Sequence, residues 1–425
     1  MRRILSVQFI LIIISMCFNN AFTLSASNRS QILKKPYSLP DKRYLKQEVG
    51  FDEDTYLNFH ELSTKYNYPC EEHSVTTEDG YILKLFRILP KCNETRGRHP
   101  VLLMHGVLDS SDAWILAGAE LGIGFILARN CYDVWAANHR GNSYSRRHVR
   151  FDPDVDPEFW NYTFDEHGNY DIPAVIDYIL LNTSQTKLSY MGHSQGTTDF
   201  FAMNSLRPKY NDKIAVSIHL APVVFLRHTE SQISIVVAER SAFIKKLFDA
   251  IGLRELFAKD RLAHFVTEVL CQLAPEIVCG QILAITVGYR QGTVSSRTLS
   301  VAFGHLLNGI SSKDAAHFGQ LVISGSFQRY DEGRKGNIKR YGLPKPPQYN
   351  LSLVTAPVVL FTAKNDWLSS QKDVKLLTSK VPKVVENYVV PLPYWSHHNY
   401  LWDPQAAVYV YPKMLEYLNK FNPIT

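Results

Sequence analysis

Clustered charge, repeated segments and long hydrophobic runs are all scarce in this chain of 425 residues. The 46 Lys and Arg side chains exceed the 40 Asp and Glu side chains by only six, and they are scattered along the sequence. Because nucleic-acid-binding proteins concentrate basic residues, we expect no nucleic-acid partner. There is no internal repeat or low-complexity tract, and after the N-terminus no apolar run reaches the length of a membrane-spanning helix. The composition is that of an ordinary globular protein.

Cysteine is also rare, with six residues, one of which lies in an apolar N-terminal run. The other five form an odd set, so at least one is unpaired. In an oxidising compartment Cys271 and Cys279, eight positions apart, are the natural local pair. Cys70 and Cys92 flank a hairpin-like stretch and are a second candidate pair. Cys131 begins an apolar stretch, and we interpret it as a buried free thiol.

The N-terminus has the pattern of a signal peptide. Arg2 and Arg3 precede an apolar run to about residue 18, and small and polar residues follow. We expect residues 1–24 to be removed; an uncleaved membrane anchor is the alternative. Passage through the secretory pathway agrees with five Asn-x-Ser/Thr glycosylation sites, at Asn28, Asn93, Asn161, Asn182 and Asn350. We expect a secreted or lysosomal protein, and no short retention signal chooses between the two.

Short apolar runs alternate with helix-like patterns through most of the chain. The runs typical of buried parallel strands are 100–104, 132–137, 188–191, 214–220, 358–362 and 388–390. A β-hairpin is expected over 73–88, and helices over 172–181 and 197–205. A last helix is expected over 406–418, kinked or started by Pro412. This alternation predicts an α/β fold with a mostly parallel, doubly wound sheet and helices on both faces.

One stretch, residues 222–330, interrupts the alternation with amphipathic helix-like segments and no convincing strand pair. Inserted between two strands, it would cover the carboxyl edge of the sheet, where such folds bind ligands. We therefore divide the chain into a signal peptide (1–24), an exposed lead-in or pro-segment (25–50), a first core part (51–221), a cap with a lid (222–330) and a second core part (331–425).

The pentapeptide Gly192-His193-Ser194-Gln195-Gly196 carries the most informative chemistry. It follows the expected strand 188–191 and opens the expected helix from Thr197. A nucleophile elbow requires this context, because the turn is too sharp for bulky residues at either glycine and it exposes the serine hydroxyl. The spacing predicts Ser194 as a catalytic nucleophile.

A serine hydroxyl needs a base, and the base needs an orienting carboxylate, in the chain order Ser, acid, His. Asp366 lies in the loop directly after the expected strand 358–362 and is our candidate acid. Asp373 is the rival, seven residues later and expected on the next helix. His397 and His398 both follow the expected strand 388–390, and spacing alone does not choose between them as the base.

Two backbone N–H groups must also stabilise the developing oxyanion. Gln195, the residue after the nucleophile, supplies the first. The segment His105-Gly106-Val107 follows the early strand 100–104; its glycine lets the backbone approach, and Val107 is the expected second donor. A simple strand-to-loop turn is the alternative for this segment. The mechanism needs no metal or cofactor, and we expect none.

Several motifs together resemble the acid lipases, the family of gastric lipase and lysosomal acid lipase with many insect digestive members. They are the strings HGVLDS from His105, YDVW from Tyr132, NHRGN from Asn138 and GHSQGTT from Gly192. The likeness runs from about residue 56 to 417 and implies the α/β-hydrolase fold. It also implies Ser194 as nucleophile and Asp366 as acid, and it implies His397 as base through the pattern Pro393-Tyr-Trp-Ser-His397.

The resemblance further implies Val107 and Gln195 as oxyanion donors and a cap disulfide between Cys271 and Cys279. A third cap cysteine of the family is replaced by Val287, and the cap diverges strongly from about residue 227 to 304. The implied activity is hydrolysis of neutral lipid esters at a lipid–water interface. The implied substrates are triacylglycerols and, as a second candidate, cholesteryl esters. A catalytically silent lipid-binding protein and an esterase for smaller soluble esters are the alternatives. An acidic pH optimum follows from the resemblance alone.

Overall fold

The protein is described by a computed structural model over residues 42–92, 100–257 and 262–422. The expected signal peptide, most of the lead-in, Asn28 and Asn93 lie outside these described residues. Eight strands form one central sheet, in the order β1-β2-β4-β3-β5-β6-β9-β10. Their bounds are β1 Cys70–Thr76, β2 Ile82–Ile88, β3 Val101–Met104, β4 Val134–Ala137, β5 Leu188–His193, β6 Ile214–Leu220, β9 Val358–Thr362 and β10 Val384–Val389.

The sheet is parallel except at one edge. β1 and β2 form the expected antiparallel hairpin, and β2 is antiparallel to β4. All other neighbours in the sheet are parallel, which the alternation of strands and helices predicts. Strands β3, β4, β5 and β9 are buried at every position, because helices cover both faces. The expectation of an α/β fold with a mostly parallel sheet is confirmed.

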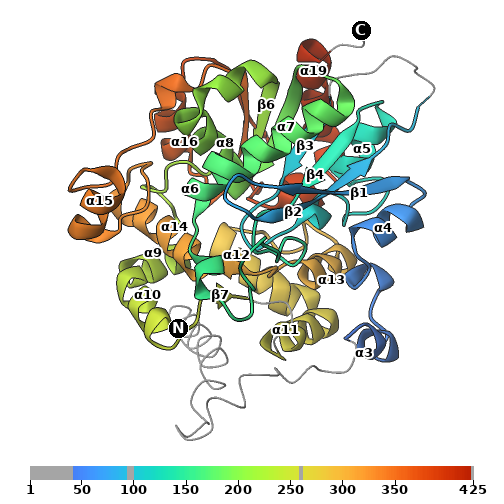
Figure 1. Cartoon of the computed structure of the whole chain (residues 1–425). Coiled ribbons are helices and arrows are strands. Elements are labelled where there is room, and N and C mark those ends of the chain that lie inside the picture. Colours follow the sequence, from blue (N-terminus) through green and yellow to red (C-terminus); the bar gives the residue numbers. More distant parts are fainter. Residues whose placement is uncertain (1–41, 93–99, 258–261, 423–425) are drawn as a thin grey trace, which may run out of the picture.

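Two hydrophobic cores, one on each face, hold the sheet between its helices. Figure 1 shows α7, α8 and α16 flanking the strands, with α5 and α19 also packed around the sheet. The helices outside the inserted segment are α3 Lys42–Glu48, α4 Phe59–Lys65, α5 Ile123–Arg129, α6 Phe164–Glu166, α7 Ile172–Thr183, α8 Gln195–Leu206, α15 Gly333–Tyr341, α16 Gln371–Thr378, α17 Asn399–Trp402, α18 Ala406–Tyr409 and α19 Tyr411–Phe421. The expected last helix is divided in two, and Pro412 lies in the first turn of its second part.

The inserted segment lies between β6 and β9 and is mainly helical. Its helices are α9 Gln232–Glu239, α10 Ser241–Ala250, α11 Leu262–Leu273, α12 Gln281–Val287, α13 Ser296–His305 and α14 Ser312–Ser324. Figure 1 shows α9 to α13 gathered at one end of the molecule, below the sheet. The expectation that this segment holds no strand pair was wrong. Residues Glu255–Leu256 (β7) and Ile310–Ser311 (β8) form a small antiparallel ladder, too short to leave an alternating pattern in the sequence.

The cysteine pairing differs from the sequence-based expectation. Cys92 and Cys131 form a disulfide, so the interpretation of Cys131 as a buried free thiol was wrong. Cys131 does not begin a strand; it lies in the turn before β4 with a positive φ of 66°, and it is only partly buried. The candidate pair of Cys70 and Cys92 is not formed, and Cys70 is the free cysteine among the described residues. Cys271 and Cys279 are bonded.

No single helix of the described residues is long and apolar enough to cross a membrane. Two neighbouring helical segments are long and apolar enough only when they are taken together: Phe265–Leu273 and Glu276–Val287. The angle between them is 112°.

Candidate active site

Ser194 lies at the sharp turn between β5 and α8, with a φ of 51° and a ψ of −116°. This backbone conformation is strained for a residue with a side chain, and such strain is common at nucleophile elbows. The flanking glycines are required by close packing: a Cβ atom on Gly192 would lie 2.7 Å from the carbonyl group of Gly196, and one on Gly196 would collide with the carbonyl oxygen of Met104. The turn therefore holds the Ser194 hydroxyl in one place.

His397 lies opposite this hydroxyl. Its Nε2 atom is 2.7 Å from Ser194 Oγ, and its Nδ1 atom is 2.9 Å from Asp366 Oδ2 and 3.1 Å from Oδ1. The carboxylate orients the ring with its proton on Nδ1, which leaves the Nε2 lone pair to accept the hydroxyl proton. All three side chains are buried, with at most 4% of any residue exposed.

The loop after β9 fixes Asp366, the candidate acid. Asp366 Oδ1 accepts hydrogen bonds from the backbone N–H groups of Leu368 and Ser369, at 3.0 and 2.9 Å. These bonds hold the plane of the carboxyl group against the imidazole. His193 holds the loop that carries His397, because its Nε2 atom donates a 2.8 Å hydrogen bond to the His397 carbonyl oxygen.

The two rival residues lie elsewhere. His398 stacks on Trp402, with ring centroids 4.5 Å apart, and burial lowers the pKa of its imidazole well below the ordinary value. Asp373 lies in the first turn of α16, where it accepts hydrogen bonds from the backbone and ring of His228, both at 2.8 Å. Neither side chain hydrogen-bonds to Ser194 or His397 among the contacts described.

The segment expected to supply the second oxyanion donor runs beside the nucleophile. A Cβ atom on Gly106 would lie 3.1 Å from His193 Nδ1 and 3.2 Å from Ser194 Cβ, so a side chain here would require these neighbours to shift by a few tenths of an ångström. Val107 follows directly, and Leu108 has a positive φ of 60° that turns the chain away. The Leu108 carbonyl oxygen accepts a 3.1 Å hydrogen bond from the backbone N–H of Asn308, which ties this loop to the inserted segment.

A buried polar cluster behind Gln195 was not foreseen from the sequence. His139 lies within the NHRGN string of the family resemblance, and no sequence pattern points to His167, Asp199 or Asp314. Asp199 Oδ2 lies 2.6 Å from His139 Nε2, and Asp199 Oδ1 lies 3.4 Å from His167 Nδ1. The residues come from four separate segments, so no local spacing announces them.

Two family models match the chain. The model for the alpha/beta hydrolase fold covers residues 99–404, and one for a partial alpha/beta-hydrolase lipase region covers residues 59–118. A monoglyceride lipase of Saccharomyces cerevisiae, solved as a soluble variant with a substrate analog, has a similar fold, with a TM-score of 0.51 and 13% identity over 84% of this chain and 97% of its own.

Curated relatives are similar over most of their length. Lipase 1 of Drosophila melanogaster is 38% identical over 88% of this chain and 82% of its own, and gastric triacylglycerol lipase of Bos taurus is 34% identical over 87% and 92%. A putative lysosomal acid lipase/cholesteryl ester hydrolase of Crotalus adamanteus is 31% identical over 88% and 94%. The resemblance noted in the sequence is thereby confirmed: the chain belongs to the acid-lipase family of α/β-hydrolases.

Proposed function

We propose that this chain hydrolyses ester bonds of neutral lipids, triacylglycerols and cholesteryl esters, through an acyl-enzyme intermediate on Ser194. The observation that carries the proposal is the hydrogen-bonded series from Ser194 Oγ through His397 to Asp366, with heavy-atom distances of 2.7 and 2.9 Å. These distances are those of a nucleophile in contact with its base and of a base in contact with its orienting acid.

In this mechanism Ser194 Oγ attacks the ester carbonyl carbon while its proton moves to His397 Nε2. The imidazolium that forms is stabilised by Asp366, and it returns the proton to the leaving alcohol. Water then attacks the acyl-enzyme with His397 again as base, and the fatty acid is released. Nothing in these steps requires a metal or cofactor.

The developing oxyanion is stabilised by the backbone N–H groups of Val107 and Gln195. The close approach of Gly106 to Ser194 supports Val107 as a donor, and the position of Gln195 at the start of α8 supports the other. The N-terminus of a helix also favours negative charge beside it.

Residues 222–330 act as a cap with a lid over this site and open at a lipid–water interface. Support comes from the large apolar side chains that this segment leaves in solvent: Phe243 is 70% exposed, and Leu273 and Ile277 are each 75% exposed. Apolar side chains exposed on the cap are available to contact a lipid surface when it opens.

The protein passes through the secretory pathway and is secreted or lysosomal, with residues 1–24 removed as a signal peptide. Two disulfides support an oxidising compartment. The side chains of three candidate glycosylation sites, Asn161, Asn182 and Asn350, are exposed, as modification requires. The relatives named as gastric and lysosomal lipases agree with either destination.

Rates on emulsified triacylglycerol, cholesteryl ester and a short-chain soluble ester test the proposal. We expect hydrolysis of the emulsions by wild type and a loss on the order of 10⁶-fold in kcat for Ser194→Ala. A fluorophosphonate should label wild type but not this variant. Failure of wild type to label would favour a silent lipid-binding protein, whereas labelling with turnover of the soluble ester alone would favour a small-ester esterase.

A further inference from the structure

Five buried side chains form a continuous polar group behind the active site, which we call the Gln195 network: Gln195, His139, His167, Asp199 and Asp314. Gln195 Nε2 lies 2.9 Å from Asp314 Oδ2 and 3.1 Å from His167 Nδ1. The amide thus directs its two N–H bonds at an acid and a ring nitrogen. His167 in turn lies against Asp199, which hydrogen-bonds to His139.

Asp314 is the member of the network that reaches it from the inserted segment. It lies in the first turn of α14, and its Oδ1 atom accepts a 2.7 Å hydrogen bond from the backbone N–H of Phe164. Helix α14 packs against α9 and α10, so its first turn joins the inserted segment to the residue after the nucleophile. The two carboxyl oxygens of Asp314 therefore connect the core at Phe164 with the side chain of Gln195.

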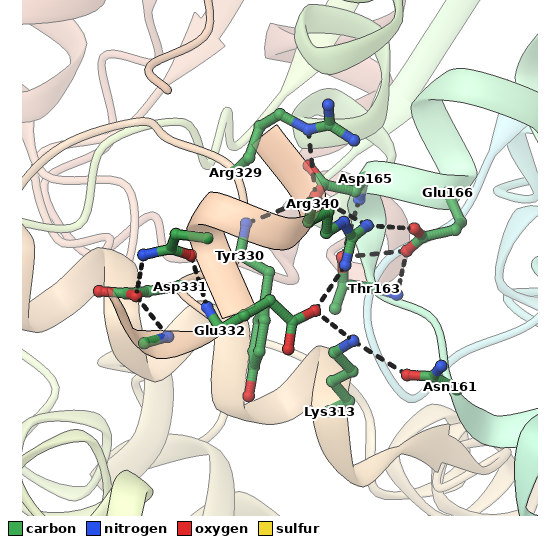
Figure 2. Close-up of polar contacts among 12 residues, drawn as sticks. Asn161, Thr163, Asp165, Glu166, Lys313, Arg329, Tyr330, Asp331, Glu332 and Arg340 are labelled. Atoms are coloured by element: carbon green, nitrogen blue, oxygen red, sulfur yellow. Dashed lines mark hydrogen bonds and ion pairs between the residues drawn. The ribbon is translucent and has the colours of Figure 1, made fainter. Parts of the chain in front are cut away.

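Two residues shortly before Asp314 fix the start of α14. Ser311 Oγ donates a 2.6 Å hydrogen bond to the carbonyl oxygen of Trp160. Lys313 Nζ lies between Asn161 Oδ1, at 2.9 Å, and Glu332 Oε1, at 2.7 Å, as Figure 2 shows. Glu332 also accepts from Arg340, which extends this ionic group to the surface beyond α14. Because its neighbours are held in this way, the Asp314 carboxyl group has little freedom to follow a displaced Gln195.

The position of the Gln195 side chain matters because its amide and the oxyanion-donating backbone N–H belong to the same residue. The backbone N–H of Gln195 is one of the two proposed donors, and small displacements of such a group cost catalysis heavily. Burial, with Asp199 as the next cause, raises the pKa of Asp314 well above its ordinary value. A raised pKa at this place reduces the negative charge beside the developing oxyanion.

We propose that Asp314 is a positioning residue for ester hydrolysis: it holds the side chain of Gln195, so that the backbone N–H of Gln195 stays directed at the ester carbonyl oxygen. The inference rests on the proposed function. It assigns to the inserted segment a part in the oxyanion site as well as a covering role.

The same network contains three residues with the spacing of metal ligands, and the geometry argues against a metal. Ligand atoms of His139, His167 and Asp199 lie within 4.8 Å of one another. The two rings, however, are stacked, with centroids 4.6 Å apart and planes at 17°. Imidazoles that bind one ion through in-plane lone pairs approach it from different directions, which face-to-face stacking opposes. The Nδ1 atom of His167 also lies 3.1 Å from Gln195 Nε2, so this nitrogen already has a hydrogen-bond donor.

The test uses the full chain with Asp314→Ala and a short-chain ester. We expect kcat to fall about 10- to 100-fold with KM within about 2-fold of wild type, because only transition-state stabilisation is lost. The inhibition constant of a trifluoromethyl ketone, whose hemiketal oxyanion occupies the same site, should weaken by the same factor as kcat/KM falls. An unchanged kcat, or an effect on KM alone, overturns the inference.

Three further variants separate positioning from general stability. Arg340→Met removes the outer ion pair to Glu332 and touches neither Gln195 nor Asp314; it should lower the unfolding temperature while kcat is kept. Asp314→Asn has the same shape and can pair with a reversed Gln195 amide, so it should restore most of the activity lost in Asp314→Ala. Gln195→Ala keeps the backbone N–H and should itself lose about 10- to 100-fold in kcat. This last variant tests the inference even if Asp314→Ala does not fold.

A double-mutant cycle and a chelator complete the experiment. If Asp314 acts through Gln195, the double variant Gln195→Ala/Asp314→Ala should be no slower than Gln195→Ala alone; additive losses overturn the inference. Dialysis of wild type against EDTA should leave activity unchanged, and a loss restored by Zn²⁺ would replace the inference with a metal site. An inactive wild type counts against the proposed function, whereas an active wild type with an equally active Asp314→Ala counts against this inference alone.

Discussion

Asp366 and His397 are joined by a shared hydrogen bond, in which Nδ1 of the imidazole lies 3.1 Å from one carboxylate oxygen and 2.9 Å from the other. Of those two oxygens, Oδ1 is also bound by two backbone N–H groups of the same loop. The carboxylate is thus held by its own loop before it orients the ring. Asp373, seven residues later, has no such relation to His397 and instead belongs to the packing between α16 and His228.

Replacing Asp366 with Asn should lower kcat about 10³- to 10⁴-fold, because an amide in this position favours the wrong imidazole tautomer. The matched control is Asp373→Asn, which should lower the unfolding temperature through the lost bonds to His228 and leave kcat nearly unchanged. Steady-state rates on a soluble ester and thermal unfolding curves for both variants check this pair. Similar losses of kcat in the two variants would contradict the assignment of the acid.

His397 and His398 are adjacent, and their substitutions should have opposite results. His397→Gln should lose on the order of 10⁴-fold or more in kcat, because Ser194 is left without a base. His398→Gln should stay within about 3-fold of wild type, since that ring packs on Trp402 and burial keeps it neutral. Rates of fluorophosphonate labelling at one pH compare the two variants directly, and a slow His398→Gln with a normal His397→Gln would reverse the assignment.

The core strands and the residues that follow them were predictable from the sequence because each leaves a strong local pattern. The run Val358–Thr362 is apolar except for its last residue and is buried throughout, and Asp366 comes four residues after it, where a parallel sheet exposes its edge. The strand before His397 was placed less well: β10 begins at Val384, whereas 388–390 was expected. Its residues are only partly covered, and partly buried edge strands leave a weaker pattern.

Contacts between segments that are distant in the chain could not be predicted from local sequence patterns. Cys131 looked like the first residue of a buried strand, but a left-handed turn places it beside Cys92 instead. The choice of His397 over His398 came from family resemblance and not from spacing. The Gln195 network joins residues that are up to 175 positions apart, as from His139 to Asp314, and no local pattern connects them.

The disulfide between Cys92 and Cys131 should contribute substantially to stability. It closes a separation of 39 residues, for which chain-entropy estimates give up to about 4 kcal/mol. Cys92→Ser/Cys131→Ser should therefore lower the free energy of unfolding more than Cys271→Ser/Cys279→Ser, whose 8-residue separation corresponds to about 2.5 kcal/mol. Chemical denaturation of both double variants measures the difference. Equal losses, or a larger loss for the shorter loop, would contradict the prediction.

Cys70 should be unreactive in the folded protein. Burial, the largest cause, and the neighbouring Glu72 and Glu71 together raise the pKa of its thiol to about 12. Because the thiolate is the nucleophile, iodoacetamide at pH 8 should label native protein very slowly and denatured protein fast. Cys70→Ser should show no labelling in either state if the other four cysteines are paired. Fast labelling of native wild type at this cysteine would contradict the expectation.

His219 on β6 should limit stability in acid. The ring is fully buried between Phe200 and Phe201, and neither nitrogen has a hydrogen-bond partner among the described residues. Burial lowers its pKa to about 3, while in the unfolded chain the value is about 6.5. The native state therefore excludes a proton that the unfolded state binds below pH 6.5. The stability that depends on the neutral ring is complete above that pH and is lost progressively as the pH falls toward 3.

Between pH 8 and pH 5 this single histidine should cost wild type about 2 kcal/mol of unfolding free energy. His219→Leu removes the titrating group and keeps an apolar side chain against the two phenylalanines, so the difference in unfolding free energy between pH 8 and pH 5 should shrink by about that amount. Urea denaturation at both pH values measures it for each protein. At pH 8 the ring is neutral in both the native and the unfolded state. Any difference in unfolding free energy between wild type and His219→Leu at this pH therefore reports packing alone, which separates packing from protonation. If the variant keeps the full pH dependence of wild type, buried His219 is not a source of acid sensitivity.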